Sequence, residues 1–187
     1  MDSVFETNGF LLVKNLWDPS ELKRPVPERK GYYKYKSDGF SWKPVEPQVI
    51  GSTSTYCYPK YREIHSGLRV KVEDLIGSKL HDTYYFDRFY FPGQKLKEHT
   101  DRPACEISVS IHIDTNLECD WPLWVRTPEG KDCPVVMKPG DGVLYKGCER
   151  PHWRDPLPGD TGHYFHQAFF HYVLQNGPRA KYAGDVL

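Results

Sequence analysis

The sequence predicts a mainly β fold: a double-stranded β-helix, or jelly roll, that carries a helical buttress on its N-terminal side. After residue 82 the chain is a series of short β-branched or aromatic segments, separated by turns that contain proline and glycine. Regularly spaced strands of this kind are typical of a sandwich or barrel. We therefore expect one domain over residues 1–187, with the jelly-roll core at about 82–173.

The part of the chain before the core contains the helical signal. Residues 10–13 form a short apolar strand after a turn at Asn8-Gly9, and residues 17–60 are rich in Pro, Gly, Tyr and Lys. We expect this second stretch to be irregular, with short strands at best, and to supply lid or recognition loops. Residues 61–80 predict a helix that ends near Gly77. Its apolar positions at helical spacing are Ile64, Leu68, Val72, Leu75 and Ile76.

The predicted strands of the core are 83–91, 105–114, 121–127, 134–138, 142–147 and 163–173. The segment 105–114 alternates most clearly, so its side chains divide between two faces. One face holds Cys105, Ile107, Val109, Ile111 and Ile113, and the other holds Glu106, Ser108, Ser110, His112 and Asp114. We expect the polar face to line a polar cavity inside the roll.

Composition limits the classes of partner. The chain has 39% hydrophobic and 14% aromatic residues, which indicates a folded protein with a real core. Its 25 basic and 25 acidic residues balance, and no block of like charge occurs. A generic nucleic-acid or membrane binder has a basic footprint that this chain lacks. A polyanionic partner would have to be recognised locally.

The five cysteines are an odd number at wide spacing, without a C-x-x-C pair. The start MDSVFETNGF lacks the basic and apolar regions of a signal sequence. The longest apolar stretch is also far too short to cross a bilayer. We expect free thiols and a cytoplasmic protein without a membrane partner.

The strongest candidate site is His99-Thr100-Asp101 together with His152, which follows about fifty residues later. Two imidazoles and one carboxylate are the ligand set of a facial-triad iron(II) site, which leaves coordination positions open. The short motif is weak by itself and gains weight only from its structural context. Here that context is an aromatic strand and a Pro-Gly turn before the motif.

The order of the motifs is similar to that in a known family. The motifs are Tyr90-Phe91-Pro92-Gly93, His99-x-Asp101, the alternating strand, a Trp-containing strand, Pro139-Gly140-Asp141 and His152. This order resembles the iron(II)- and 2-oxoglutarate-dependent oxygenases of the prolyl-4-hydroxylase-like branch, including an uncharacterised subgroup of phage and bacterial proteins. The resemblance covers about residues 82–173, and the opening GFLLVKNL is similar to the first strand of many members.

The resemblance implies a function and a ligand set. His99, Asp101 and His152 would hold Fe(II), while 2-oxoglutarate and O₂ would take the open positions as cosubstrates. The expected activity is that of a dioxygenase that hydroxylates a small molecule, an amino acid or a peptide side chain. The protein would hold the geometry and exclude water, because the difficult chemistry belongs to the cofactor.

The chain departs from the family at the cosubstrate pocket. Members place an Arg or Lys about nine to eleven residues past the distal histidine, where this chain has Thr161, Gly162 and His163. The family strand matches best when His163 takes the basic position. Its face would then also carry Phe165, Gln167, Phe169 and His171.

Other residues are candidates for the same pocket. Tyr90 matches a pocket tyrosine, and His112 falls where relatives carry a tyrosine that bonds the far carboxylate. Arg154 lies two residues after His152, so on a strand the two side chains point to the same side. Arginine is the better bidentate carboxylate binder, whereas the charge of a histidine is conditional near neutral pH. Arg154 and His163 stay equal alternatives at this point.

Four other functions need consideration. A helical segment would place His163, His166 and His171 in a zinc site, but aromatic density favours a strand. A cupin-like metalloenzyme that does not use 2-oxoglutarate would explain the missing Arg or Lys. A non-catalytic jelly-roll binding module would have no reason to keep the triad. Nucleic-acid demethylases of the superfamily carry a second arginine several residues beyond the one that follows the distal histidine, whereas here Arg154 is the only arginine between His152 and Arg179.

Overall fold

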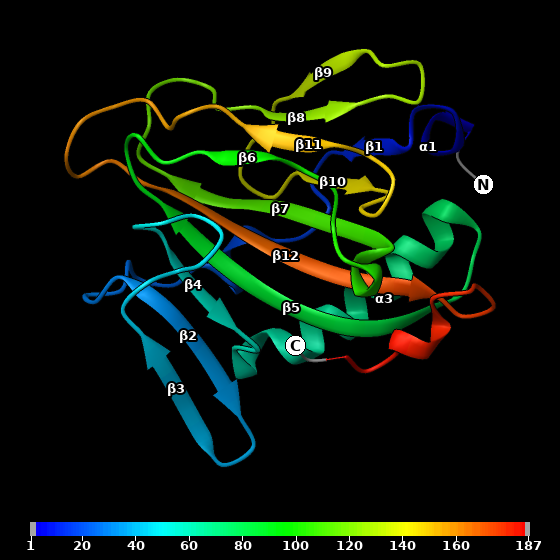
Figure 1. Cartoon of the computed structure of the whole chain (residues 1–187), viewed down its shortest axis with the longest axis horizontal. Helices are drawn as coiled ribbons and strands as arrows, with labels where there is room; N and C mark the ends of the chain where they lie inside the picture. Colours follow the sequence, from blue (N-terminus) through cyan, green and yellow to red (C-terminus); the bar gives the residue numbers. More distant parts are fainter. Residues whose placement is uncertain (1–2, 186–187) are drawn as a thin grey trace.

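The computed structural model describes residues 3–185 (Figure 1). The larger sheet has the strand order β1 (Phe10–Val13), β10 (Gly142–Tyr145), β7 (Ile107–Thr115), β12 (Phe165–Leu174), β5 (Leu80–Tyr90), β4 (Thr53–Tyr56), β2 (Gly31–Lys36) and β3 (Gly39–Lys43). The smaller sheet has the order β6 (Leu96–His99), β11 (His152–Arg154), β8 (Leu123–Arg126) and β9 (Asp132–Val135). The predicted mainly β architecture is confirmed.

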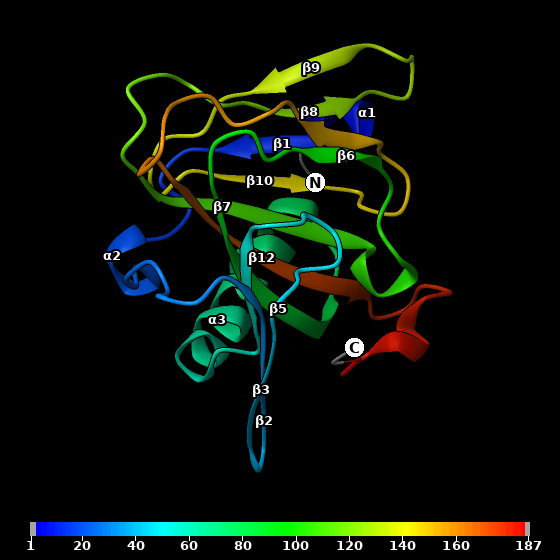
Figure 2. The same cartoon turned by 60° about the vertical axis from the view of Figure 1, so that its left-hand side comes forward.

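The two sheets lie face to face, with the smaller sheet above one end of the larger one (Figure 2). Apolar side chains from both sheets pack between them. This cluster holds Leu123, Val125, Val135, Met137, Val143 and Tyr145, with Phe10 and Leu12 packed against it. The space between the sheets is therefore closed at this end by hydrophobic contact.

Burial confirms the alternation of β7 from Ile107 to Ile113, whereas Asp114 follows a register shift against β12 and pairs with Lys23. The isoleucine and valine side chains of β7 pack in the core on the helix side of the larger sheet. Ser108, Ser110 and His112 are buried on the other face, inside the roll. Cys105 and Glu106 are an exception, because the strand begins only at Ile107. Cys105 belongs to a 3-10 turn, Pro103–Cys105, and packs in a different cluster from Ile107.

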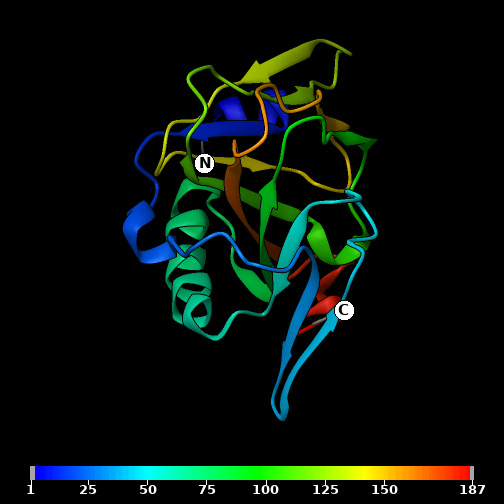
Figure 3. The same ribbon diagram turned by 90° about the vertical axis from the view of Figure 1, so that its left-hand side faces the viewer.

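The predicted helix is α3 (Arg62–Ile76), which ends at Gly77 with a left-handed φ of +66°. This conformation suits glycine, because other residues pay a steric cost there. Ile64, Leu68, Val72 and Ile76 are buried, and Figure 3 shows α3 against one face of the larger sheet. The shorter helices are α1 (Ser3–Asn8) and α2 (Pro19–Leu22), with 3-10 turns at Pro59–Tyr61 and Ala180–Tyr182. The helical buttress is confirmed.

Residues 17–60 are more ordered than expected, since they add three strands to the larger sheet. β2 pairs in parallel with β4 and antiparallel with β3, so the β2–β3 hairpin forms the edge of the sheet. Figures 1 and 3 show this hairpin projecting away from the body. Its alternating Tyr and Lys residues form a strand without a large apolar face, which explains the weak signal in the sequence.

All five cysteines are free thiols in the structure, as expected. In the part of the chain from residue 3 to residue 185, no helix is long and apolar enough to cross a membrane.

Candidate metal and cosubstrate site

The structure brings His99, Asp101 and His152 together. His99 ends β6 and is the direct cross-strand partner of His152, the first residue of β11. Their ring centroids lie 4.3 Å apart. Oδ1 of Asp101 lies 3.5 Å from Nε2 of each histidine. One donor atom from each residue lies within 4.8 Å of the others, so the three side chains are able to share one metal ion.

Backbone carbonyls orient both imidazoles. Nδ1 of His99 lies 2.9 Å from the Lys97 carbonyl oxygen, and Nδ1 of His152 lies 3.0 Å from that of Arg150. A carbonyl oxygen only accepts, so each Nδ1 is the donor and each neutral ring keeps its lone pair on Nε2. A metal-ligating histidine typically has this arrangement. Both lone pairs face the carboxylate of Asp101.

Asp101 is held ionised between these rings. Burial opposes its charge, but the rings of His152 and His99, in the protonated form that donates from Nε2, outweigh burial and hold the pKa of Asp101 well below its usual value. The backbone N–H of Asp101 donates to the Gly147 carbonyl at 2.8 Å. A Cβ atom at Gly147 would lie 2.5 Å from Oδ2 of Asp101 and 2.4 Å from the Cys105 carbonyl oxygen. Position 147 therefore has no space for a side chain.

A second group of possible ligands, Asp101, Cys105 and His171, also lies within 4.8 Å. The hydroxyl of Ser108 contacts all three of these residues. It donates to Oδ2 of Asp101 at 2.9 Å and lies 3.0 Å from Nδ1 of His171 and 3.3 Å from the Cys105 carbonyl oxygen. Ser108 has one hydrogen, so His171 is the donor to it. We interpret this group as a network that orients Asp101.

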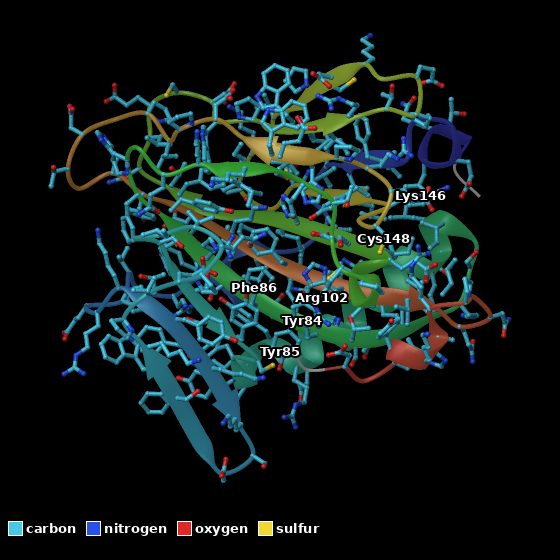
Figure 4. All side chains as sticks on the ribbon, viewed as in Figure 1. Tyr84, Tyr85, Phe86, Arg102, Lys146 and Cys148 are labelled. Atoms are coloured by element: carbon cyan, nitrogen blue, oxygen red, sulfur yellow. The ribbon has the colours of Figure 1, made fainter. Side chains whose placement is uncertain are left out.

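A small cavity of about 60 Å³ adjoins the triad. Its wall is aromatic, with Tyr84 and Phe86 from β5 (Figure 4) and one Tyr or Phe from each of β4, β10 and β12. The other lining residues are Gln48, Tyr56, Arg88, Leu96, Tyr145, Phe169 and His171. An aromatic enclosure of this kind limits the access of water to the three side chains of the triad.

Gln48 is the point where the segment 17–60 reaches the triad. Its Nε2 donates to Nε2 of His99 at 3.1 Å, while its Oε1 accepts from Arg88 at 2.8 Å. Arg88 is 1% exposed and also donates to the buried carboxylate of Glu46 at 2.8 Å. Sequence reasoning missed all three residues. The signal was present in β5, where Arg88 is a charged residue on the face of Tyr84, Phe86 and Tyr90.

Arg154 is a buried cation without a carboxylate partner among the described residues. It is 1% exposed and donates to the Trp121 carbonyl at 2.5 Å and to Oε1 of Gln167 at 2.6 Å. The rings of Trp121 and Phe165 flank its guanidinium at 4.3 and 4.8 Å. Burial lowers the pKa of Arg154 to about 10.

Three polar atoms around Arg154 lack hydrogen-bond partners within residues 3–185. They are Nε of Arg154, Nε2 of Gln167 and Nε2 of His112. A buried polar atom without a partner costs free energy, so such a group points to a ligand or bound water. Tyr90 is fully buried at the same place, with its ring 5.0 Å from that of Trp121.

His112 lies in the predicted pocket but does not have the predicted donor character. Its ring stacks on Phe165 at 4.1 Å, and its Nδ1 donates to the Met137 carbonyl at 2.8 Å. Burial lowers its pKa to about 4, so the ring is neutral at physiological pH. Its free Nε2 is therefore an acceptor and has no hydrogen to offer a carboxylate.

The prediction that His163 lies on the last strand is wrong. β12 begins at Phe165, and His163 lies in the preceding turn, where its Nδ1 accepts from the Asp160 N–H at 2.8 Å. It lines neither the metal cavity nor the surroundings of Arg154. The zinc alternative has no support either, because His166 faces the opposite side of β12 and bonds Asp87 at 2.7 Å. The predicted shared face of Phe165, Gln167, Phe169 and His171 is consistent with their contacts inside the roll.

No known family model and no curated protein sequence matches the chain. Solved structures share its fold. A Pseudomonas putida prolyl-4-hydroxylase has a TM-score of 0.61 at 14% identity, over 90% of this chain and 95% of that one. A Trichoplax adhaerens prolyl hydroxylase, solved with a peptide fragment of hypoxia inducible factor, has 0.61 at 16%, over 90% and 86%.

The epimerase SnoN from nogalamycin biosynthesis, which is described as non-haem and α-ketoglutarate dependent, has a TM-score of 0.63 at 11% identity. The alignment covers 90% of this chain and 79% of that one. The chain therefore has the fold of the prolyl-4-hydroxylase-like 2-oxoglutarate and Fe(II) oxygenases, and the predicted jelly roll is confirmed. Enzymes with this fold include hydroxylases and an epimerase.

Proposed function

We propose that the protein is a non-haem Fe(II)- and 2-oxoglutarate-dependent oxygenase that hydroxylates a small molecule, an amino acid or a peptide side chain. One observation carries the proposal: a His-Asp-His donor set and a buried arginine without a carboxylate partner lie in the same roll. His152 and Arg154 are two residues apart on β11, and both are buried.

The donor set fits Fe(II). His99 and His152 offer neutral Nε2 lone pairs, and Asp101 offers an ionised oxygen, which together make a two-histidine, one-carboxylate site. The carbonyls behind both rings and Ser108 behind Asp101 fix the direction of each donor atom. When bound, Fe(II) with 2-oxoglutarate would supply the activation of O₂.

The surroundings of Arg154 fit the far carboxylate of 2-oxoglutarate. Nε of Arg154 and Nε2 of Gln167 are buried donors without partners in residues 3–185, and a carboxylate needs donors of this kind. Trp121 and Phe165 exclude water from the guanidinium, which strengthens an ion pair there. Arg154 would thus replace the basic residue that relatives carry on their last strand.

Tyr90 and His112 have different roles in this proposal. Tyr90 is buried beside Trp121, with its hydroxyl 3.2 Å from Nη1 of Arg88. It would form the wall between the metal and Arg154. His112 would support Phe165 by stacking, because its only hydrogen is committed to Met137.

The test is turnover of 2-oxoglutarate by the purified protein with Fe(II) and O₂, measured as succinate. Wild type should form succinate, and Asp101→Ala should lose both metal binding and turnover. Wild-type protein that holds Fe(II) but never consumes 2-oxoglutarate would instead be a metalloenzyme of another kind. Protein that binds no metal would be a binding module.

A further inference from the structure

A second cavity, outside the metal site, lies beside the end of β2 that leads into the turn of the β2–β3 hairpin. Its volume of about 400 Å³ exceeds the roughly 60 Å³ of the cavity beside the triad. A volume of this size is in the range of small-ligand pockets. Three basic side chains line it, Lys34, Lys36 and Arg62, together with Tyr35, Cys57 and Pro59.

The charge around this second cavity is one-sided. Among the described residues that line it, none has a carboxylate. Residues 29–43 contain five basic side chains and one acidic side chain, Asp38, in a chain whose net charge is zero. Within residues 3–185, neither Lys36 nor Arg62 forms an ion pair with a carboxylate. Like charges around one cavity repel each other, and an anionic ligand removes that repulsion.

The backbone explains why these groups converge. Cys57 directly follows β4 and has a left-handed φ of +56°, which is uncommon for a residue other than glycine. The chain turns there towards α3, whose first residue is Arg62. Lys34 lies beside β4 through the parallel pairing of Lys34 with Tyr56. Two distant segments thus place their cations around Cys57.

A row of aromatic rings leads from the cavity beside the triad towards the basic cavity. Phe169 stacks on Phe86 at 4.4 Å, Phe86 on Tyr56 at 4.4 Å, and Tyr56 contacts Tyr32 at 4.7 Å. Three of these four residues line the cavity beside the triad. Tyr32 and Lys34 are two residues apart on β2, so their side chains share a face. The row therefore runs from the cavity beside the triad to Tyr32, two residues before Lys34 in the wall of the basic cavity.

We propose that the basic cavity binds an anionic group of the substrate, a carboxylate or a phosphate. The reacting part of the same substrate lies at the other end of the row, in the cavity beside the triad. The reaction itself rests on the proposed function. The binding of the anion does not, because no lining residue of the basic cavity is a metal ligand. Failure of one is thus distinguishable from failure of the other.

The experiment uses metal-free, full-length protein and two probes, a fluorescent hexaglutamate peptide and inorganic phosphate. Binding of the peptide is followed by anisotropy, and phosphate is added as a competitor. The Lys36→Glu substitution should weaken binding about tenfold or more. The control is Lys43→Glu, because Lys43 has the same charge and lies on the same hairpin but does not line the cavity. It should keep nearly wild-type affinity.

Alkylation of Cys57 locates the bound anion. A bound ligand should slow the reaction of Cys57 with iodoacetamide, while the exposed Cys119 should react at an unchanged rate. Protection by the peptide assigns a carboxylate ligand, and protection by phosphate alone assigns a phosphate ester. The proposal is overturned if neither probe protects Cys57, or if Lys36→Glu and Lys43→Glu weaken binding equally.

Discussion

The hydroxyl of Ser108 donates a 2.9 Å hydrogen bond to Oδ2 of Asp101, the carboxylate that lies between the two site histidines. This bond occupies one oxygen and leaves Oδ1, 3.5 Å from each Nε2, to face a metal. Asp101 is therefore arranged to offer a metal one oxygen. Ser108 belongs to β7 of the larger sheet, and Asp101 comes just after β6 of the smaller sheet. The larger sheet therefore sets the direction of the Asp101 carboxylate.

Removing this hydroxyl should weaken metal binding. We expect Ser108→Ala to lower the affinity for Fe(II) about 10- to 100-fold, the usual effect of losing a group that orients a ligand. Ser110→Ala is the matched control, because Ser110 lies on the same face of β7 and contacts the Tyr145 hydroxyl instead. Affinities are measured by competition with a chelator. Equal affinities in the two variants would show that Ser108 does not position Asp101.

Arg154→Met should separate cosubstrate binding from metal binding. Methionine fills much of the same volume but removes the charge, so the KM for 2-oxoglutarate should rise about 100-fold or more. The affinity for Fe(II) should stay within about threefold of wild type, because Arg154 does not contact the triad. Arg126→Gln, which removes a surface guanidinium on β8, is the control. An unchanged KM in Arg154→Met would remove Arg154 from the cosubstrate pocket.

Gln48 competes with a metal for the lone pair of His99. Its Nε2 donates to the Nε2 atom that a metal requires, so Gln48→Ala should raise the affinity for Fe(II) about two- to tenfold. Ile50→Ala is the control, because Ile50 lies in the same loop and is 78% exposed. Chelator competition measures both. A lower affinity in Gln48→Ala would mean that Gln48 helps to hold the metal.

His112 should make the folded state sensitive to acid. Burial lowers its pKa to about 4, below the unfolded value of 6.5. The unfolded chain therefore takes up a proton first, and stability is lost as the pH falls from about 6.5 to about 4. The contribution is up to about 3 kcal/mol over that interval. The free energy of unfolding of metal-free His112→Gln should fall less steeply with acid than that of wild type. Parallel pH profiles would contradict this.

Local patterns were sufficient for most strands of the core, for α3 and for the group of candidate metal ligands. The period-two alternation of 105–114 predicts which face of β7 is buried against α3, and the helical spacing in 61–80 predicts α3 itself. His99 and His152 were recognisable because a strand end and a turn place them by short-range rules.

Contacts between distant segments were not predictable in the same way. Arg88 binds Glu46 and Gln48 across about forty residues, which depends on how the loop lies over the finished roll. His163 shows a different effect. The polar turn before β12 uses its ring to satisfy the Asp160 N–H, and this local bond competes with the strand. The family pattern placed a basic residue there, whereas the structure places the buried cation at Arg154.

The most direct test of the central claim is an anaerobic titration of the Fe(II)-loaded protein with 2-oxoglutarate, followed by visible absorption. We predict a charge-transfer band that saturates at one equivalent in wild type, requires far more 2-oxoglutarate in Arg154→Met and is absent in Asp101→Ala. A wild-type protein that retains Fe(II) but shows no spectral change at any concentration of 2-oxoglutarate would contradict the account.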